Sequence, residues 1–224
     1  PEAYEFYLRA KHKYEKRESA DDREIARGLF NKAIKLDDSL IMAKVKLGWI
    51  YIDSSDYNKA MEILTPALKK AKEIGDKRGM AFVINAIGVI HHDENDCDKA
   101  MDYYNHSLKI GEEIGDKLKI AGSLNNIGHI YFTQGNYEKA LAYFDRAGKK
   151  FDAISEKYFA PFGWLYYFKG DYDIALDYFN KALKGQEEIG DKVGIGETWC
   201  GLGVIYYERG DYKKAKYYLE KSLD

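Results

Sequence analysis

The chain has 224 residues, of which 32% are charged and 15% aromatic, with 20 tyrosines and a formal net charge of −2. A hydrophobic content of 46% with only 3 prolines favours a folded chain over a disordered one. The net charge is not basic, as it would be in a typical nucleic-acid-binding protein. No apolar run is long enough to cross a membrane. We therefore expect neither a nucleic acid nor a membrane among the partners.

Three kinds of residue recur at nearly constant spacing. A glycine is followed after three residues by a ring and after twelve by an alanine, and the glycines lie 40, 40, 35 and 40 residues apart. The sets are Gly48, Gly88, Gly128, Gly163 and Gly203; Tyr51, His91, Tyr131, Tyr166 and Tyr206; and Ala60, Ala100, Ala140, Ala175 and Ala215. Small residues are typical of close helix crossings, and we expect the rings to fill gaps between successive hairpins.

Residues 113–147 show what one repeat contains. Apolar residues recur at steps of three and four on both sides of the polar corner Gly135-Asn136, which predicts two helices with apolar stripes. Gly135 is suited to end the first helix in left-handed backbone, and Asn136 is suited to cap the second. The sequence thus predicts a repeated helix-turn-helix hairpin.

In chain order, we predict one solenoid domain whose repeats occupy approximately residues 1–40, 41–76, 77–116, 117–154, 155–190 and 191–224. The first repeat is divergent, with Tyr14 in place of the marker glycine. Because the sequence begins at Pro1 without a methionine, we expect a fragment of a longer protein.

The connectors between repeats carry their own signal. Glu-Ile-Gly-Asp occurs at residues 73–76, 113–116 and 188–191. Its glycine is expected to end a lengthened second helix, and its aspartate to cap the next helix. The fourth-to-fifth junction lacks this connector and contains Pro161 two residues before Gly163. Proline removes a backbone hydrogen bond, so the helix there is predicted to begin late or to bend.

These residues resemble the tetratricopeptide repeat. Its pattern of Leu-Gly, then Tyr, then Ala with an aromatic residue four later is present in Leu47-Gly48 and Tyr51, Ala140 and Phe144, and Ala175 and Phe179. The resemblance implies an all-α, right-handed superhelix of about six hairpins. The 40-residue units are similar to those of kinesin light chain and bacterial peptide-pheromone receptors, which bind peptides on the inner surface. The first repeat resembles those that follow effector domains in bacterial class III adenylate cyclases and transcriptional regulators.

The resemblance also implies a binding site, because in this family the first helix of each hairpin lines a concave groove. The peptide- or protein-binding residues are then Trp49, Asn85, His92, Asn125, Asn126, His129, Trp164, Tyr167 and Tyr207. We expect Trp49 and Trp164 on one continuous wall. Asn126 matches the asparagine that kinesin light chain-type repeats use to hold peptide backbone, since an amide offers both donors and an acceptor. The Lys, Asn and Arg of the chaperone-binding clamp are missing, so chaperone C-termini are not expected.

Other chemistry is poorly supported. His91 and His92 are adjacent and point in different directions on a helix, whereas ligands on one face are three or four residues apart. Cys97 and Cys200 occupy unmatched positions, which argues against a disulfide framework and favours the cytoplasm. There is no catalytic Ser-His-Asp or Cys-His arrangement and no glycine-rich phosphate loop. We expect no metal, no cofactor and no enzyme activity.

The sequence therefore favours a cytoplasmic, non-enzymatic module that binds a peptide or protein segment in its groove. The alternatives are a regulatory arm for an attached upstream effector domain (a cyclase, kinase or transcriptional regulator) and an oligomerisation scaffold. The last helix presents apolar residues that no later helix covers, which predicts self-association through Tyr212, Ala215, Tyr218, Leu219 and Leu223.

Overall fold

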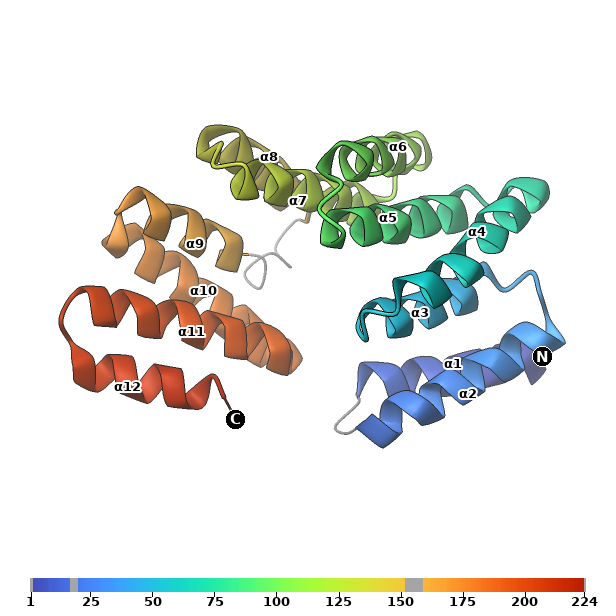
Figure 1. The fold of residues 1–224 in the computed structure, drawn as a ribbon, viewed down its shortest axis with the longest axis horizontal. Coiled ribbons are helices and arrows are strands. Elements are labelled where there is room, and N and C mark those ends of the chain that lie inside the picture. The colour runs from blue at the N-terminus through green and yellow to red at the C-terminus, as the bar shows by residue number, and fades with distance from the viewer. Residues whose placement is uncertain (1, 17–19, 152–158, 224) are drawn as a thin grey trace. The chain divides into compact units, whose positions relative to one another are not determined.

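The computed structural model describes residues 2–16, 20–151 and 159–223, and this part of the chain contains twelve α-helices and no strand. Consecutive helices pair as six hairpins, from α1 with α2 to α11 with α12 (Figure 1). The predicted all-α helical-repeat fold is confirmed. The chain divides into two compact units, residues 1–126 and 127–224, and the division falls inside α7.

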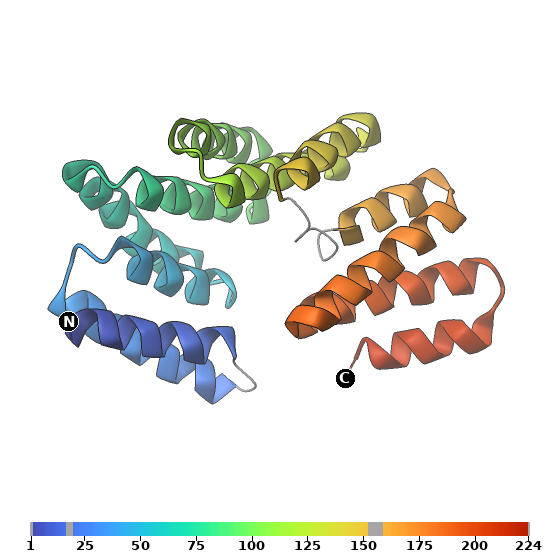
Figure 2. The same ribbon diagram turned by 180° about the vertical axis from the view of Figure 1, so that it is seen from behind.

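The first unit contains three complete hairpins and the beginning of α7. Its helices are α1 (Glu2–Glu15), α2 (Ala20–Leu36), α3 (Ile41–Ile52), α4 (Tyr57–Ile74), α5 (Lys77–Asp93), α6 (Cys97–Ile114) and the first part of α7 (Lys117–Thr133). Helices α1 and α2 lie side by side in the front view and from behind (Figure 1, Figure 2).

The second unit contains the end of α7 and the last two and a half hairpins. Its other helices are α8 (Tyr137–Phe151), α9 (Ala160–Lys169), α10 (Tyr172–Ile189), α11 (Lys192–Glu208) and α12 (Tyr212–Lys221). Helix α9 has only 10 residues, and Pro161 lies in its first turn. The predicted late start of this helix is confirmed, since the helix begins at Ala160.

The connectors form the predicted caps. Gly75, Gly115 and Gly190 have φ values of 72°, 67° and 69°, in the left-handed region that favours glycine. The Oδ1 of Asp76 accepts a hydrogen bond from the backbone N–H of Gly79 at 2.8 Å, which satisfies a free donor in the first turn of α5. Short side chains at these corners thus determine where each helix ends and the next begins.

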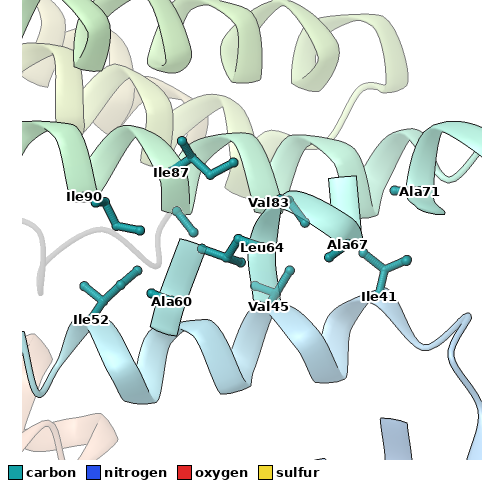
Figure 3. Close-up of a cluster of buried hydrophobic side chains, with 11 residues drawn as sticks. Ile41, Val45, Ile52, Ala60, Leu64, Ala67, Ala71, Val83, Ile87 and Ile90 are labelled. Carbon is teal, nitrogen blue, oxygen red and sulfur yellow. The ribbon is translucent and has the colours of Figure 1, made fainter. Parts of the chain in front are cut away.

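Close contacts at the marker glycines bring the two helices of a hairpin together. A Cβ added to Gly48 would lie 2.8 Å from Cδ2 of Leu64, which is too close for any other residue without movement. Figure 3 shows Leu64 between the side chains of α3 and those of α5, including Val45 and Val83. Each interior hairpin therefore shares its core with the next one.

The marker rings pack differently from the expectation. His91 stacks on Tyr103 with ring centroids 5.3 Å apart, and Tyr166 stacks on Tyr178 at 5.5 Å. These contacts lie within one hairpin, between its first and second helices, rather than between successive hairpins. The prediction was wrong on this point because the ring three residues after the glycine faces its own second helix, one turn beyond the close helix crossing.

Candidate functional site

In the first unit, the predicted binding residues lie on α3, α5 and α7. Trp49 is half-buried and packs against two neighbouring core clusters. His92, Asn125 and Asn126 are also half-buried. Each of these four side chains thus combines a packing contact with a surface that a partner can reach.

Asn85 differs from these residues because only 6% of its surface is exposed. Its Nδ2 has no hydrogen-bond partner within the described part of the chain. A buried amide without a partner costs about 1–3 kcal/mol, so this donor is a weak point of the core. A ligand could reach Asn85 only after neighbouring side chains move.

In the second unit, α7, α8, α9 and α11 enclose a pocket of about 310 Å3. Its lining consists of His129, Phe132, Phe144, Ala160, Pro161, Trp164 and Glu197. Two of these, His129 and Trp164, are among the residues predicted from the sequence. The pocket is therefore the candidate site.

Two local features of the sequence shape this pocket. A Cβ at Gly128 would lie 2.5 Å from the ring of Phe144, so glycine is needed for Phe144 to pack against α7. The next residue, His129, meets the same ring edge-on at 5.2 Å. On the other wall, Pro161 lies in the first turn of α9, and Trp164 reaches the pocket about one turn later.

Neighbouring rings restrain Trp164. It meets Phe179 edge-on with centroids 5.4 Å apart, and Tyr167 edge-on at 5.8 Å. Burial raises the pKa of the Tyr167 hydroxyl, and the Glu208 carboxylate, with which it hydrogen-bonds, raises it further. Tyr167 therefore supports the pocket without lining it, and Trp164 is held in a restricted orientation before any partner binds.

Tyr207, another of the predicted binding residues, lies near the end of α11. Its side chain is exposed and meets Tyr212 edge-on at 5.5 Å. It does not line the pocket.

The sequence analysis did not predict Glu197, which contributes a carboxylate to the lining of the pocket. Glu197 lies seven residues before Val204, the residue after the marker Gly203 in α11. Seven residues are about two helical turns, so both face the same side. The prediction considered only three- and four-residue steps from that position, and one further turn would have found Glu197.

The Glu197 carboxylate is partly desolvated by its neighbours. Its side chain is exposed, yet desolvation by its neighbours raises its pKa, and the nearby Asp191 carboxylate raises it further. Both effects disfavour the ionised form. A cation placed beside Glu197 would reverse this effect.

Other chemistries find less support in the structure. Among the described residues, no three His, Cys, Asp or Glu side chains gather as metal ligands, and both cysteines are free thiols. No helix in the described ranges is long and apolar enough to span a membrane.

Comparison with known families supports the repeat assignment. Residues 163–224 and 121–147 each match a tetratricopeptide repeat family. The chain therefore contains tetratricopeptide repeats. No curated protein sequence matches it.

Solved structures extend the likeness to the whole chain. The tetratricopeptide-repeat chain resembles BtubC from P. vanneervenii with a TM-score of 0.66 and 21% identity, covering 100% of this chain and 90% of that one. A Rap protein complexed with Competence and Sporulation Factor gives a TM-score of 0.77 at 15% identity, covering 99% of this chain and 74% of that one.

A signal transduction ATPase from Pyrococcus horikoshii, described as having a tetratricopeptide repeat sensor, gives a TM-score of 0.71 at 20% identity. The match covers 98% of this chain but 35% of the ATPase. At these identities the likeness shows the fold. Repeats of this family are typically non-catalytic, and the chain is a protein–protein interaction module.

Proposed function

We propose that the second unit binds an extended peptide or protein segment, with one partner side chain anchored in the pocket between α7, α9 and α11. The observation that carries this proposal is the pocket itself, which combines a volume of about 310 Å3 with Trp164, Phe132 and His129. Partly accessible aromatic side chains in concave sites are frequent anchors of protein interfaces. In the first unit, we propose Trp49, His92, Asn125 and Asn126 as partner contacts, and Asn85 after side-chain movement.

The test begins with a partner of known sequence. Random twelve-residue peptides are selected against the full chain by messenger-RNA display, and the affinity of the best peptide is measured by fluorescence anisotropy. We expect Trp164→Ala to weaken this peptide at least tenfold, because truncating an anchoring tryptophan costs about 2 kcal/mol or more.

Tyr166→Ala is the matched control. Tyr166 lies on the same short helix and is also half-buried, but it stacks on Tyr178 and does not line the pocket. Its replacement should change the affinity less than threefold. Equal effects of the two substitutions, in variants with unchanged circular dichroism, would remove the pocket from the proposed function.

A second candidate function is a sensor arm that regulates an attached effector domain. The likeness to the ATPase with a tetratricopeptide repeat sensor favours this candidate. The decisive observation is the coding sequence upstream of residue 1. A cyclase, kinase or DNA-binding signature there would support the sensor function, and an unrelated or absent domain would exclude it.

A further inference from the structure

Among the described residues, the lining of the second-unit pocket contains one carboxylate and neither lysine nor arginine. Glu197 contributes the negative charge, and the rest of the lining is aromatic, imidazole or small and apolar. The parts of α9 and α11 around Trp164 and Glu197 continue this pattern, while Lys169 and Lys192 lie at the far ends of these helices. Residues 160–168 contain no charged residue, and residues 193–208 contain two glutamates and no lysine or arginine.

Glu197 forms no ion pair within the described part of the chain. The second glutamate of α11, Glu208, instead accepts a hydrogen bond from Tyr167. The ionised form of Glu197 is electrostatically unfavourable, because its carboxylate is partly desolvated and lies near the Asp191 carboxylate without a cation beside it in the described residues. A cation from a binding partner would compensate this cost.

The rings beside Glu197 favour the same occupant. Trp164 and Phe132 are half-buried, so part of each ring remains accessible from the pocket. Aromatic faces attract cations, tryptophan most strongly. A planar guanidinium can stack on a ring while its N–H groups donate to a carboxylate, which an ammonium does less well.

We propose that the pocket takes the side chain of a basic residue, arginine in preference to lysine, from the partner segment. This inference rests on the proposed function and specifies its ligand class. The guanidinium lies between Trp164 and Phe132 and donates hydrogen bonds to Glu197. An uncharged His129, which lines the same pocket, would not repel this cation.

The experiment compares two peptide libraries that differ in one group. Both carry fluorescein and contain neutral random residues around a central position, which is arginine in one library and citrulline in the other. Citrulline keeps the length and planarity of arginine without its charge. Binding to the full chain is measured at pH 8, where imidazole is ordinarily neutral.

We expect the arginine library to bind the wild-type chain at least tenfold more tightly than the citrulline library. Glu197→Gln, which keeps the size of the side chain, should reduce this ratio below threefold by weakening the arginine library alone. Glu188→Gln removes the same charge from the exposed end of α10, outside the pocket, and should leave the ratio unchanged.

The outcomes separate the two proposals. Equal binding of arginine and citrulline, or a ratio that survives Glu197→Gln, would overturn the basic-ligand inference while leaving peptide binding in place. If neither library binds the wild-type chain, the proposed function fails, and this inference fails with it.

Discussion

Lys119 is a buried cation in the first unit. Its Nζ lies 3.9 Å from the centroid of the Phe82 ring, a cation–π contact that replaces part of the lost hydration. Burial lowers the pKa of Lys119 from 10.5 to about 8, although the Asp116 carboxylate opposes the shift, and the Arg78 guanidinium adds to it. The folded state therefore carries a cost for keeping this amine charged at neutral pH.

Lys119→Met should raise the free energy of unfolding at pH 7 by ~1–3 kcal/mol, because each pKa unit corresponds to ~1.4 kcal/mol. Between about pH 8 and 10.5, the folded wild type has released the proton while the unfolded chain still holds it. Wild-type stability from this group therefore rises with pH, and the advantage of the variant shrinks. Urea unfolding of both proteins at pH 7 and 10 checks this, and a pH-independent difference would contradict it.

Gly128 and Gly122 offer a matched pair on α7. A Cβ at Gly128 would meet Phe144 at 2.5 Å, whereas a Cβ at Gly122 would find nothing within 4 Å. Gly128→Ala should destabilise the chain by ~1–3 kcal/mol through overpacking, despite its better helix propensity. Gly122→Ala should stabilise it by ~0.5–1 kcal/mol. Thermal unfolding followed by circular dichroism compares them, and equal shifts would show that the close contact relaxes at little cost.

The candidate site could be predicted only in part. His129 and Trp164 were found because they follow a marker glycine directly, at an offset that the repeat defines. Glu197 lines the same pocket without matching an offset, and Phe144 is a packing ring in its hairpin. A pocket depends on how several helices meet, so repeat spacing alone does not identify its whole lining.

Helix ends followed the sequence closely, because caps depend on two or three neighbouring residues. Gly135 has a φ of 73°, and Asn136 Oδ1 accepts a hydrogen bond from the backbone N–H of Lys139 at 3.2 Å, both as predicted. The stacking of the marker rings within their own hairpins, as for His91 on Tyr103 and Tyr166 on Tyr178, was not predicted. This stacking depends on how far each helix is rotated about its own axis. The spacing of apolar residues does not define that rotation closely enough to predict which rings meet.

The sequence Gly-Asp-Tyr occurs at residues 170–172 and 210–212, before α10 and α12. Comparing the two positions measures how much one N-cap hydrogen bond contributes to stability. Asp211 Oδ1 accepts a hydrogen bond from the backbone N–H of Lys214 at 3.1 Å, while Asp171 makes no side-chain cap bond. Asp211→Ala should therefore cost ~1 kcal/mol of stability, and Asp171→Ala clearly less. Urea midpoints of the two variants provide the measurement. A larger loss at Asp171 would mean that charge at the helix N-terminus matters more than the hydrogen bond.

At the scale of the molecule, family and fold were readable from the sequence, but the ligand was not. The recurring glycines, alanines and rings are the residues that pack one helix on another, so their pattern reports the architecture. Ligand contacts occupy positions that vary from repeat to repeat, as Trp49, Val89, His129 and Trp164 do after their glycines. The repeat pattern therefore predicts the residues that pack the helices, but not the residues that contact a ligand.

The prediction for the C-terminal helix needs correction at Leu219, Tyr218 and Ala215, and Ala215 is buried. Leu219 was predicted to belong to an uncovered apolar face, but a Cβ at Gly203 would lie 2.7 Å from its Cγ. Leu219 therefore packs within its own hairpin, and Leu219→Glu would damage the fold instead of testing association. Tyr218 also packs inward by stacking on Tyr206 at 5.6 Å. The exposed large hydrophobic residues at this end are Tyr212, Tyr217 and Leu223.

We expect association between copies of the chain through this end, because exposed fractions of 65% for Tyr212 and 52% for Tyr217 leave much apolar ring surface in water. Light scattering at micromolar concentration should show a mass above that of a monomer. Combined Tyr212→Lys and Tyr217→Lys should return it to the monomer value, since like charges would meet at the contact. Tyr4→Lys is the matched control, because Tyr4 is 54% exposed on α1 at the other end of the chain. A monomeric wild type, or an equal loss of mass with Tyr4→Lys, would contradict association through the C-terminal helix.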